Sequence, residues 1–285
     1  MFSDLLLYSV QIVDLHCHSS ASDGLLPPGE VARRAAENGV NILALTDHDD
    51  LGGLPDARAV ASETGMQLVN GVEISIEWGG LQVHVVGLNF DDRDVALNAG
   101  LASIRSGRIG RAQRMSAELE KVGIEGCFDG AMRHAENPNL ISRAHFARYL
   151  VEIGVCKDVR SVFESYIVPG RPGYVEHRWA TLEESVGWIV GAGGIAVIAH
   201  PGRYKLSRTE MRKLLENFKS VGGQAIEVIS GSHSLDNVAV FSRLAREFGF
   251  MASCGSDFHG PGESYIDLGR LAPTPQGLTP VWEAF

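Results

Sequence analysis

The sequence contains little cysteine, no long apolar run and no excess of basic residues, and each absence excludes a class of protein. Its four cysteines include no C-x-x-C pair, which argues against a zinc ribbon and against a disulfide framework. No stretch approaches the roughly 18 to 20 apolar residues of a membrane span. Residues 1–11 lack the basic start and cleavage site of a secretory signal. We therefore expect a cytoplasmic protein with no membrane partner.

The formal net charge of −10 at pH 7 bears on the partners of the chain. Affinity for a nucleic-acid backbone comes mainly from Lys and Arg, so long double-stranded DNA is not an expected partner. A small, highly charged phosphate ester stays compatible with this charge, because bound divalent ions would dominate the field of their own site. With 285 residues, 45% of them hydrophobic, the chain can bury a large core and still carry an insert.

Histidines and carboxylates accompany a series of predicted strands. Side chains alternate along a strand, so His16 and His18 face the same way, and Asp23 in the following turn can meet them. The loops after the strands of a parallel βα barrel or wound sheet converge on one rim, so we expect the other groups to join this site. Only His84 is expected inside a strand. The predicted metal ligands are His16, His18, Asp23, His48, Glu73, His84, His200, Asp257 and His259.

This predicted ligand set contains nitrogen and oxygen donors but no thiolate. Such a set suits manganese, iron or zinc in a hydrolytic role better than structural zinc. Nine ligands exceed what one ion needs, so we expect two or three ions that share bridging carboxylates. Asp14, Asp47 and Asp49 lie beside ligands in the sequence, and they are candidates to accept hydrogen bonds from the ligand imidazoles.

The hydrophobic pattern predicts alternating helices and strands on both sides of a helical stretch. From Asp91 to about Tyr174 the alternation stops and polar helical patterns replace it, which predicts a helical insert. The predicted helices outside this stretch are 27–38, 54–64, 181–192, 207–219 and 235–248. The predicted strands after the first are 40–45, 66–72, 81–88, 195–199, 224–229 and 250–254.

Seven segments, in order, resemble the motif series of the PHP (polymerase and histidinol phosphatase) superfamily. They are D-L-H-C-H-S, S-D-G, L-T-D-H-D, G-V-E-I-S, V-H-V-V-G, I-A-H-P-G and G-S-D-F-H. The resemblance covers residues 12–91 and about 180–270. Within the superfamily the layout resembles the bacterial TrpH/YciV group, whose studied members are 3',5'-nucleoside bisphosphate phosphatases and the 5'-to-3' exoribonuclease RNase AM.

The resemblance implies an α/β fold, a distorted, seven-stranded TIM-like βα barrel with a helical insertion domain. The phosphoesterase domain would comprise residues 11–91 and 175–285, and residues 92–174 would cap the substrate. The implied enzyme is a metal-dependent phosphoric monoester or diester hydrolase with two to three divalent ions, Mn²⁺ first and Fe²⁺, Zn²⁺ or Mg²⁺ as alternatives. The implied substrates are a small phosphorylated nucleotide, which loses its 3'-phosphate, and a short single-stranded RNA end with a 5'-phosphate. Glu73 would be the bridging carboxylate, and Asp257, His259 or His145 would protonate the leaving group.

Within the predicted insert, four arginines follow one another at intervals of three residues. They are Arg105, Arg108, Arg111 and Arg114. On one helix this spacing gives a basic stripe that turns by about 60° per step. Such a run is often only a solvated face. The functional alternative is that one or two of the four, with Arg108 and Arg111 as the candidates, reach a distal phosphate of the substrate.

The segment from Ile141 to Ala147 resembles the motif R-x-H-F-A of the TrpH/YciV group. Arg143 is the best candidate for binding a non-scissile phosphate, because a guanidinium can bind two phosphate oxygens at once. His145 could bind the same phosphate, donate a proton or serve the structure alone. Residues two apart diverge by about 200° on a helix, so a joint role requires that they lie at the start of a helix or in a turn.

Two other functions stay open at this level. A phosphatase for a compound such as histidinol phosphate would have no need of the arginine-rich insert, which suggests a second phosphate on the substrate. A non-catalytic metal-binding accessory module is disfavoured because none of the nine ligands of the family is missing.

Overall fold

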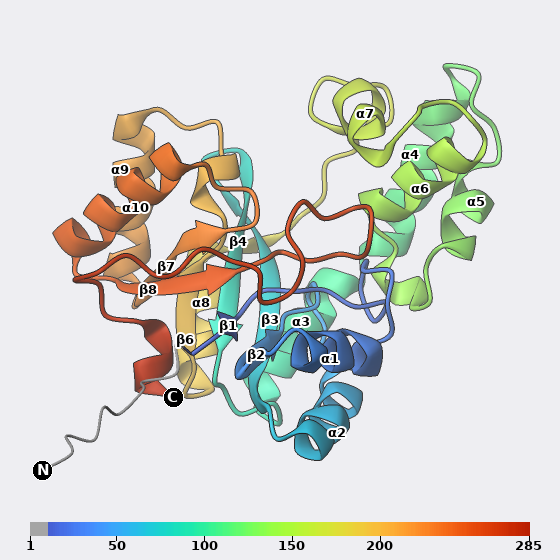
Figure 1. Ribbon diagram of the computed structural model, residues 1–285. Helices are drawn as coiled ribbons and strands as arrows, with labels where there is room; N and C mark the ends of the chain where they lie inside the picture. Colours follow the sequence, from blue (N-terminus) through green and yellow to red (C-terminus); the bar gives the residue numbers. More distant parts are fainter. Residues whose placement is uncertain (1–10) are drawn as a thin grey trace, which may run out of the picture.

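A computed structural model of the protein describes residues 11–285 and shows an α/β structure (Figure 1). The predicted absence of a signal sequence falls almost entirely on residues 1–10, which lie outside this description. The strands of the described part are β1 (Val13–Asp14), β2 (Ile42–Leu45), β3 (Gln67–Trp78), β4 (Leu81–Leu88), β5 (Ala180–Thr181), β6 (Ile195–Ile198), β7 (Ala225–Ser230) and β8 (Met251–Gly255). Among residues 11–285, no helix combines the length and the apolar character that crossing a bilayer requires.

The strands form one sheet that nearly closes into a barrel. Its order is β1-β2-β3-β4-β6-β7-β8, with the short β5 paired to β3. Beyond the ends of this path, Leu15 N donates to Cys254 O at 2.9 Å, and Asp257 N donates to His16 O at 2.8 Å. These hydrogen bonds link the β1 and β8 segments, so the expected distorted barrel of seven strands is confirmed.

One strand runs against the others and distinguishes the sheet from a regular parallel barrel. β4 is antiparallel to both of its neighbours, β3 and β6, whereas the pairs β1-β2, β2-β3, β6-β7 and β7-β8 are parallel. The turn between β3 and β4 is Gly79-Gly80, with φ of 60° and 78°. Two consecutive residues with positive φ make the tight turn that suits a hairpin, and glycine adopts this conformation without steric cost.

The hairpin also lengthens β3 beyond the predicted strand of 66–72. The segment Glu73–Trp78 pairs residue by residue with β4, so Glu73 lies inside a strand and not just after one. That part of the prediction is wrong, because the second half of β3 forms through its pairing with β4. His84 lies inside β4, as expected.

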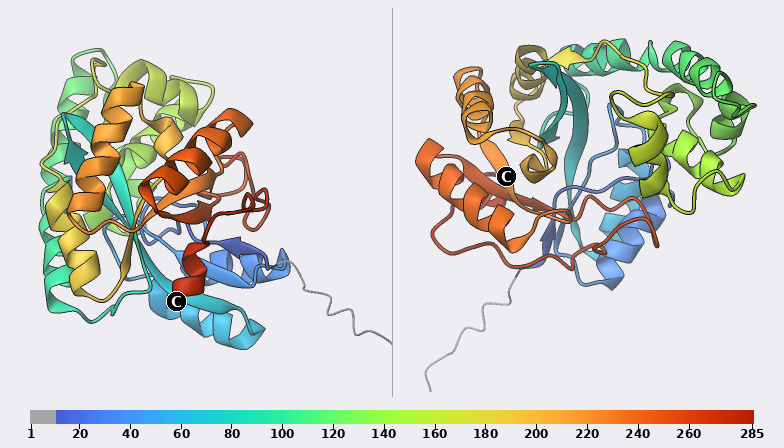
Figure 2. Two further views of the ribbon diagram at one scale, coloured as in Figure 1. Left: turned by 90° about the vertical axis from the view of Figure 1, so that its left-hand side faces the viewer. Right: turned by 90° about the horizontal axis from the view of Figure 1, so that it is seen from above.

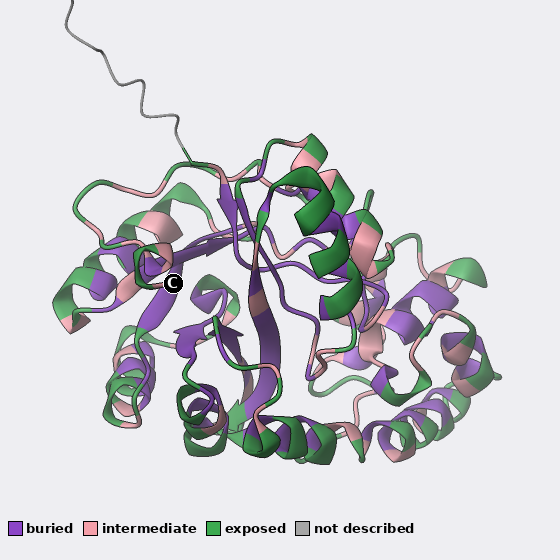
Figure 3. Ribbon diagram, turned by 90° about the horizontal axis from the view of Figure 1, so that it is seen from below, coloured by how far each residue is buried: buried purple, intermediate pink, exposed green. Residues whose placement is uncertain are grey.

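Helices cover the outside of the barrel and bury their apolar faces against it. Figure 3 shows the strands buried and the helices buried mainly on their inner sides. In α9, for example, Met211, Leu214, Leu215 and Phe218 are buried, the spacing of an amphipathic helix. The helices around the barrel are α1 (Pro28–Glu37), α2 (Leu54–Thr64), α3 (Val95–Arg105), α8 (Leu182–Gly191), α9 (Arg208–Ser220) and α10 (Leu235–Phe248). Two predicted strands differ from these bounds: β3, and the first strand, which was expected to continue through His18 but ends at Asp14. The other predicted elements outside the helical stretch agree to within two residues.

The remaining α-helices lie to one side of the barrel (Figure 2). They are α4 (Arg108–Glu120), α5 (Cys127–Arg133), α6 (Arg143–Glu152), α7 (Val159–Val162) and the π-helical turn Phe163–Ile167 that continues α7. Their buried side chains, among them Met115, Leu119, Phe146 and Leu150, form an apolar cluster of their own. Leu97 and Leu101 of α3 instead belong to the main core, so the separate cluster begins after α3.

Candidate metal centre and phosphate site

The segment after β1 brings two histidines to the inside of the barrel. His16 and His18 are fully buried, and their Nε2 atoms lie 3.2 Å apart. Cys17 between them points the other way, into the apolar cluster beneath α1, and its Sγ lies 3.4 Å from Ala44 O. The alternation of an extended chain therefore separates the imidazoles from the thiol, as the sequence predicts.

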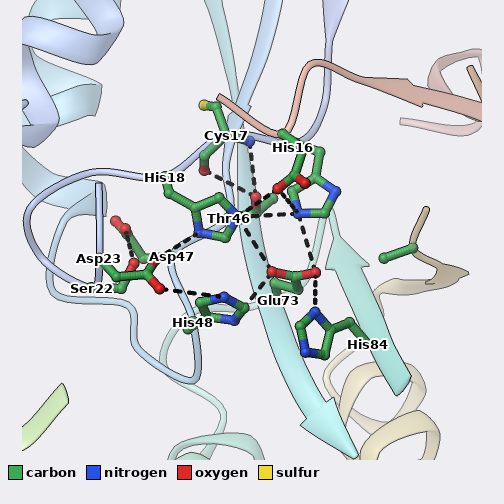
Figure 4. A network of polar contacts seen from close by, with 12 residues as sticks. His16, Cys17, His18, Ser22, Asp23, Thr46, Asp47, His48, Glu73 and His84 are labelled. Carbon is green, nitrogen blue, oxygen red and sulfur yellow. Dashed lines mark hydrogen bonds and ion pairs between the residues drawn. The ribbon is translucent and has the colours of Figure 1, made fainter. Parts of the chain in front are cut away.

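Glu73 lies at the centre of the candidate site (Figure 4). Its carboxylate oxygens approach five imidazoles, at 3.3 Å from His16 Nε2, 3.3 Å from His18 Nε2, 3.1 Å from His48 Nδ1, 2.7 Å from His84 Nδ1 and 2.9 Å from His200 Nε2. Burial alone would raise the pKa of Glu73, but the facing imidazoles, His84 first, hold it well below the usual range. The carboxylate is therefore ionised and available as a shared ligand.

Four groups of side chains place ligand atoms close enough to hold a divalent ion. They are His18-Asp23-His48-His259, His16-Glu73-His200, His16-His18-Asp257 and His48-Glu73-His84, and within each group the ligand atoms lie within 4.8 Å of one another. Together they contain the nine residues that the sequence singled out and no other residue. The structure therefore brings all nine predicted side chains together at one place.

The donor atoms of these groups fit a bound cation. His18 Nδ1, His200 Nδ1 and Asp23 Oδ1 are buried and have no hydrogen-bond partner, and His48 Nδ1, although 3.1 Å from Glu73, makes no hydrogen bond of suitable geometry. A buried polar atom without a partner costs free energy, and such atoms in native proteins usually have a partner or an ion. Imidazole nitrogens and carboxylate oxygens are the ligands that manganese, iron and zinc accept in hydrolytic sites.

A buried carboxylate that the sequence analysis missed holds two of the histidine segments in place. Glu227 in β7 is 1% exposed, with Oε1 at 2.7 Å from His16 Nδ1 and Oε2 accepting from His200 N at 2.5 Å. A carboxylate on Nδ1 fixes the tautomer in which Nε2 carries the free lone pair. The sequence feature that could have revealed Glu227 is its position as a single charged residue within the apolar strand Ala225–Ser230.

The three aspartates predicted to support the imidazoles do not contact them, so that expectation is wrong. Asp47 accepts from Ser19 N, Ser19 Oγ and Ser22 Oγ, and Asp14 accepts from Ser256 N and Gly269 N. Asp49 accepts from Ser75 N and pairs with Arg108. Their oxygens bind the loops that carry the ligands. For Asp47, next to His48, the alternation of an extended chain accounts for this, whereas Asp49 has a φ of 52° and leaves the extended conformation.

The cluster opens into a cavity of about 820 Å³ whose walls carry several arginines. Arg108 and Arg111 lie one turn apart at the start of α4, only 4% and 5% exposed, and each guanidinium is 5.2 Å from the centre of the Trp179 ring. Arg143 and Arg203 line the same cavity. Burial and then the positive charges of Arg143 and Arg108 lower the pKa of Arg111 to about 9. Such crowding of cations favours a bound anion.

The four regularly spaced arginines do not form one stripe. α3 ends at Arg105 and α4 begins at Arg108, so a break in the helix separates them. Arg105 donates to Asp49 O, and Arg114 is exposed to solvent. The prediction of a continuous helix is wrong here, because Ser106-Gly107 interrupts it. Only Arg108 and Arg111 of the four line the cavity.

Arg143 and His145 lie in the first turn of α6, the position that a joint role would require, but only Arg143 reaches the cavity. Ser142 caps the helix, and His145 Nδ1 accepts from Ser142 N at 2.9 Å, which completes a capping box. Burial lowers the pKa of His145 to about 4. Arg143 lines the cavity, whereas His145 is 1% exposed and does not line it.

Asp257 and His259 follow β8 on the same side of the cavity. Asp257 Oδ1 is 3.3 Å from His18 Nε2, and its Oδ2 is 2.5 Å from Arg203 Nη1. His259 Nε2 is 3.5 Å from Asp23 Oδ1. Both side chains line the cavity, so they face both the metal-binding groups and the space where a ligand would lie.

Comparison with known proteins agrees with this geometry. A 3',5'-nucleoside bisphosphate phosphatase from Chromobacterium violaceum is 56% identical over 270 residues, 95% of each chain. A 5'-3' exoribonuclease from Haemophilus influenzae is 42% identical over 272 residues, 95% of this chain and 98% of the relative. The solved structure of an amidohydrolase from C. violaceum, with bound sulfate and no metal, has a TM-score of 0.94 at 55% identity and covers 96% of this chain and 95% of its own. The PHP domain family matches residues 14–230, which confirms the predicted superfamily. The chain belongs to the PHP domain family.

Proposed function

We propose that the protein is a metal-dependent hydrolase that removes the 3'-phosphate of nucleoside 3',5'-bisphosphates. The observation that carries this proposal is one cavity lined both by metal-binding groups and by Arg108, Arg111 and Arg143. A substrate with two phosphates could place the scissile one among the imidazoles and the other against the guanidinium groups. The name of the C. violaceum relative supports the same reaction.

The nine clustered side chains are the proposed ligands of two or three divalent ions. Mn²⁺ is the first candidate, and Fe²⁺, Zn²⁺ or Mg²⁺ are the alternatives, because the donor set lacks sulfur. When bound, such ions would polarise the phosphate oxygens and lower the pKa of a water molecule toward neutrality. Glu73 is the proposed bridging ligand, since its two oxygens face five imidazoles.

The other residues of the cavity take roles that their positions support. Arg143, with Arg108 and Arg111, would bind the non-scissile phosphate, because planar guanidinium groups match phosphate oxygens. His259 lines the cavity and is the better candidate to protonate the leaving oxygen. Burial alone would raise the pKa of Asp257, but Arg203 and His18 hold it well below its usual range and keep that carboxyl ionised. His145 does not line it, and its Nδ1 serves the helix cap, so a positioning role for the start of α6 suits it better.

A second activity, 5'-to-3' exonucleolytic cleavage of short 5'-phosphorylated RNA, is favoured by the relative from H. influenzae. The same arginines would bind the 5'-phosphate of an RNA end and of a bisphosphate nucleotide, so the two activities would share one site. The net charge of −10 argues against long double-stranded DNA as a substrate. A cytoplasmic location stays a prediction.

Phosphate release with added Mn²⁺ tests the proposal on three substrates: adenosine 3',5'-bisphosphate, a 5'-phosphorylated RNA oligonucleotide followed by its nucleotide products, and histidinol phosphate. We expect fast turnover of the first two and its loss in Arg143→Ala. A matched pair on one helix adds a control, because Arg111→Ala should weaken turnover whereas Arg114→Ala, whose side chain is exposed, should not. Preference for histidinol phosphate, or turnover that is indifferent to Arg143, would refute the assignment.

A further inference from the structure

The cavity extends well beyond the metal-binding groups and the arginines. Arg143 and Val151 both line it, and they lie eight residues apart on α6, which corresponds to about 12 Å along the helix axis. Its volume of about 820 Å³ is within the range of pockets that enclose a whole small-molecule ligand and exceeds the needs of a phosphate group. The cavity therefore has room for a portion of a ligand that is not a phosphate.

Apolar and aromatic side chains contribute to this additional part, beside the charged Asp158, Arg160 and Glu263. Val151, Val159, Phe163 and Tyr265 line it, and the first three come from the helices beside the barrel. Phe163 begins the π-helical turn, a feature that is frequent at functional sites. The cavity therefore combines acid and imidazole groups, guanidinium groups and an aromatic wall. A nucleotide has complementary parts, because its phosphates match the imidazole and guanidinium groups and its flat base matches the aromatic wall.

Tyr265 is the aromatic residue of this wall whose ring is free to receive a ligand. It is 79% exposed, and it is the only aromatic among the exposed large hydrophobic side chains of residues 11–285. The ring of Trp179, by contrast, already faces two guanidinium groups, and the Phe163 ring lies 5.7 Å from the guanidinium carbon of Arg143. An exposed ring that lines a cavity is suited to stacking against a base.

The loop that carries Tyr265 is fixed at the residues next to it. In Figure 1 this loop follows β8 and passes below α7 and beside α6. Glu263 accepts two hydrogen bonds from Arg148 of α6, each at 2.8 Å, and Ser264 Oγ accepts from His259 N at 2.7 Å. The Tyr265 hydroxyl itself lies 3.3 Å from an Arg160 nitrogen of α7. The ring is thus held near the candidate metal ligand His259 and opposite the helices beside the barrel.

We propose that Tyr265 stacks on the base of the nucleotide whose phosphates occupy the part of the cavity lined by imidazoles and arginines. This inference rests on the proposed function and names the group that distinguishes a nucleotide from a sugar phosphate. Every base has a π-face, so stacking tolerates all four bases. We therefore expect adenosine and uridine nucleotides to bind with similar affinity, and both to bind more tightly than a phosphate without a base.

Binding measured by calorimetry on the Mn²⁺-loaded protein tests the inference without relying on turnover. The probes are adenosine 5'-monophosphate and ribose 5-phosphate, and the proteins are the wild type, Tyr265→Phe and Tyr265→Ala. We expect the wild type and Tyr265→Phe to prefer the nucleotide by roughly 5- to 150-fold, the range of base-stacking aromatic residues, and Tyr265→Ala to lose most of that preference. The affinity for ribose 5-phosphate should stay within about twofold in all three, which also shows that the loop is intact.

Two results would overturn the base site. One is a wild-type protein that binds both probes equally, and the other is a preference for the nucleotide that survives Tyr265→Ala. These outcomes are separate from a failure of the proposed function, which would be an absence of phosphate release from adenosine 3',5'-bisphosphate. A preference for the nucleotide that depends on Tyr265 would support the base site even then.

Discussion

Replacing Glu227 by glutamine removes one acceptor from a buried carboxylate and leaves its shape unchanged. The carboxylate accepts from the His16 ring at 2.7 Å and from His200 N at 2.5 Å. A glutamine amide has one oxygen and one NH₂ group, so it can accept only one of the two hydrogen bonds. A buried donor left without a partner costs about 1–3 kcal/mol. We expect the free energy of unfolding of Glu227→Gln to fall by this amount.

The same substitution should weaken metal binding, because His16 loses the partner that fixes its tautomer and orientation. Loss of such a partner typically lowers metal affinity by about 10- to 100-fold. Competition with a chelator measures Mn²⁺ affinity, and chemical denaturation measures stability. Glu247→Gln is the control, since Glu247 pairs with Arg212 on the surface and exposed pairs contribute about 0–1 kcal/mol. Mn²⁺ affinity of Glu227→Gln within twofold of the wild type would refute the positioning role of Glu227.

Three further predictions concern the support of the site. An alanine Cβ at Gly255 would overlap the His16 side chain where β8 passes β1. Gly255→Ala should therefore lower both the melting temperature and the Mn²⁺ content of the protein. An unchanged metal content would contradict this. Burial lowers the pKa of His177 to about 4, below its value of about 6.5 in the unfolded chain, so protonation favours unfolding. The free energy of unfolding should therefore decline as the pH falls from about 6.5 to 4, less steeply in His177→Phe, and equal slopes in denaturation curves would refute the reasoning. Arg148→Met should destabilise the protein by about 1–3 kcal/mol in denaturation, because it removes the largely buried pair with Glu263, and no loss would show that the pair contributes nothing.

The metal-binding cluster could be predicted from the sequence because local rules determine most of it. Alternation in an extended segment puts His16 and His18 on one side, and the convergence of loops at one rim of a barrel brings Asp257 and His259 to them. The order of the seven motifs then identified the superfamily. These features depend on residues close together in the chain and on one general property of βα folds.

The features that the sequence did not predict depend on contacts between distant segments. Glu227 supports His16 across 211 residues of chain, and only the closure of the barrel between β8 and the β1 segment reveals it. The full length of β3 depends on its pairing with β4, which the pattern of one strand does not disclose. The break between Arg105 and Arg108 is different, because Ser106-Gly107 marks it within the sequence.

The most direct test of the account is to follow phosphate release from adenosine 3',5'-bisphosphate while metal-free protein is titrated with Mn²⁺, with the bound metal and the nucleotide product determined in the same samples. The account predicts no release without metal, activity that requires at least two ions per chain, and adenosine 5'-monophosphate as the product. Hydrolysis by the metal-free protein, or no hydrolysis when two or three ions are bound, would contradict it.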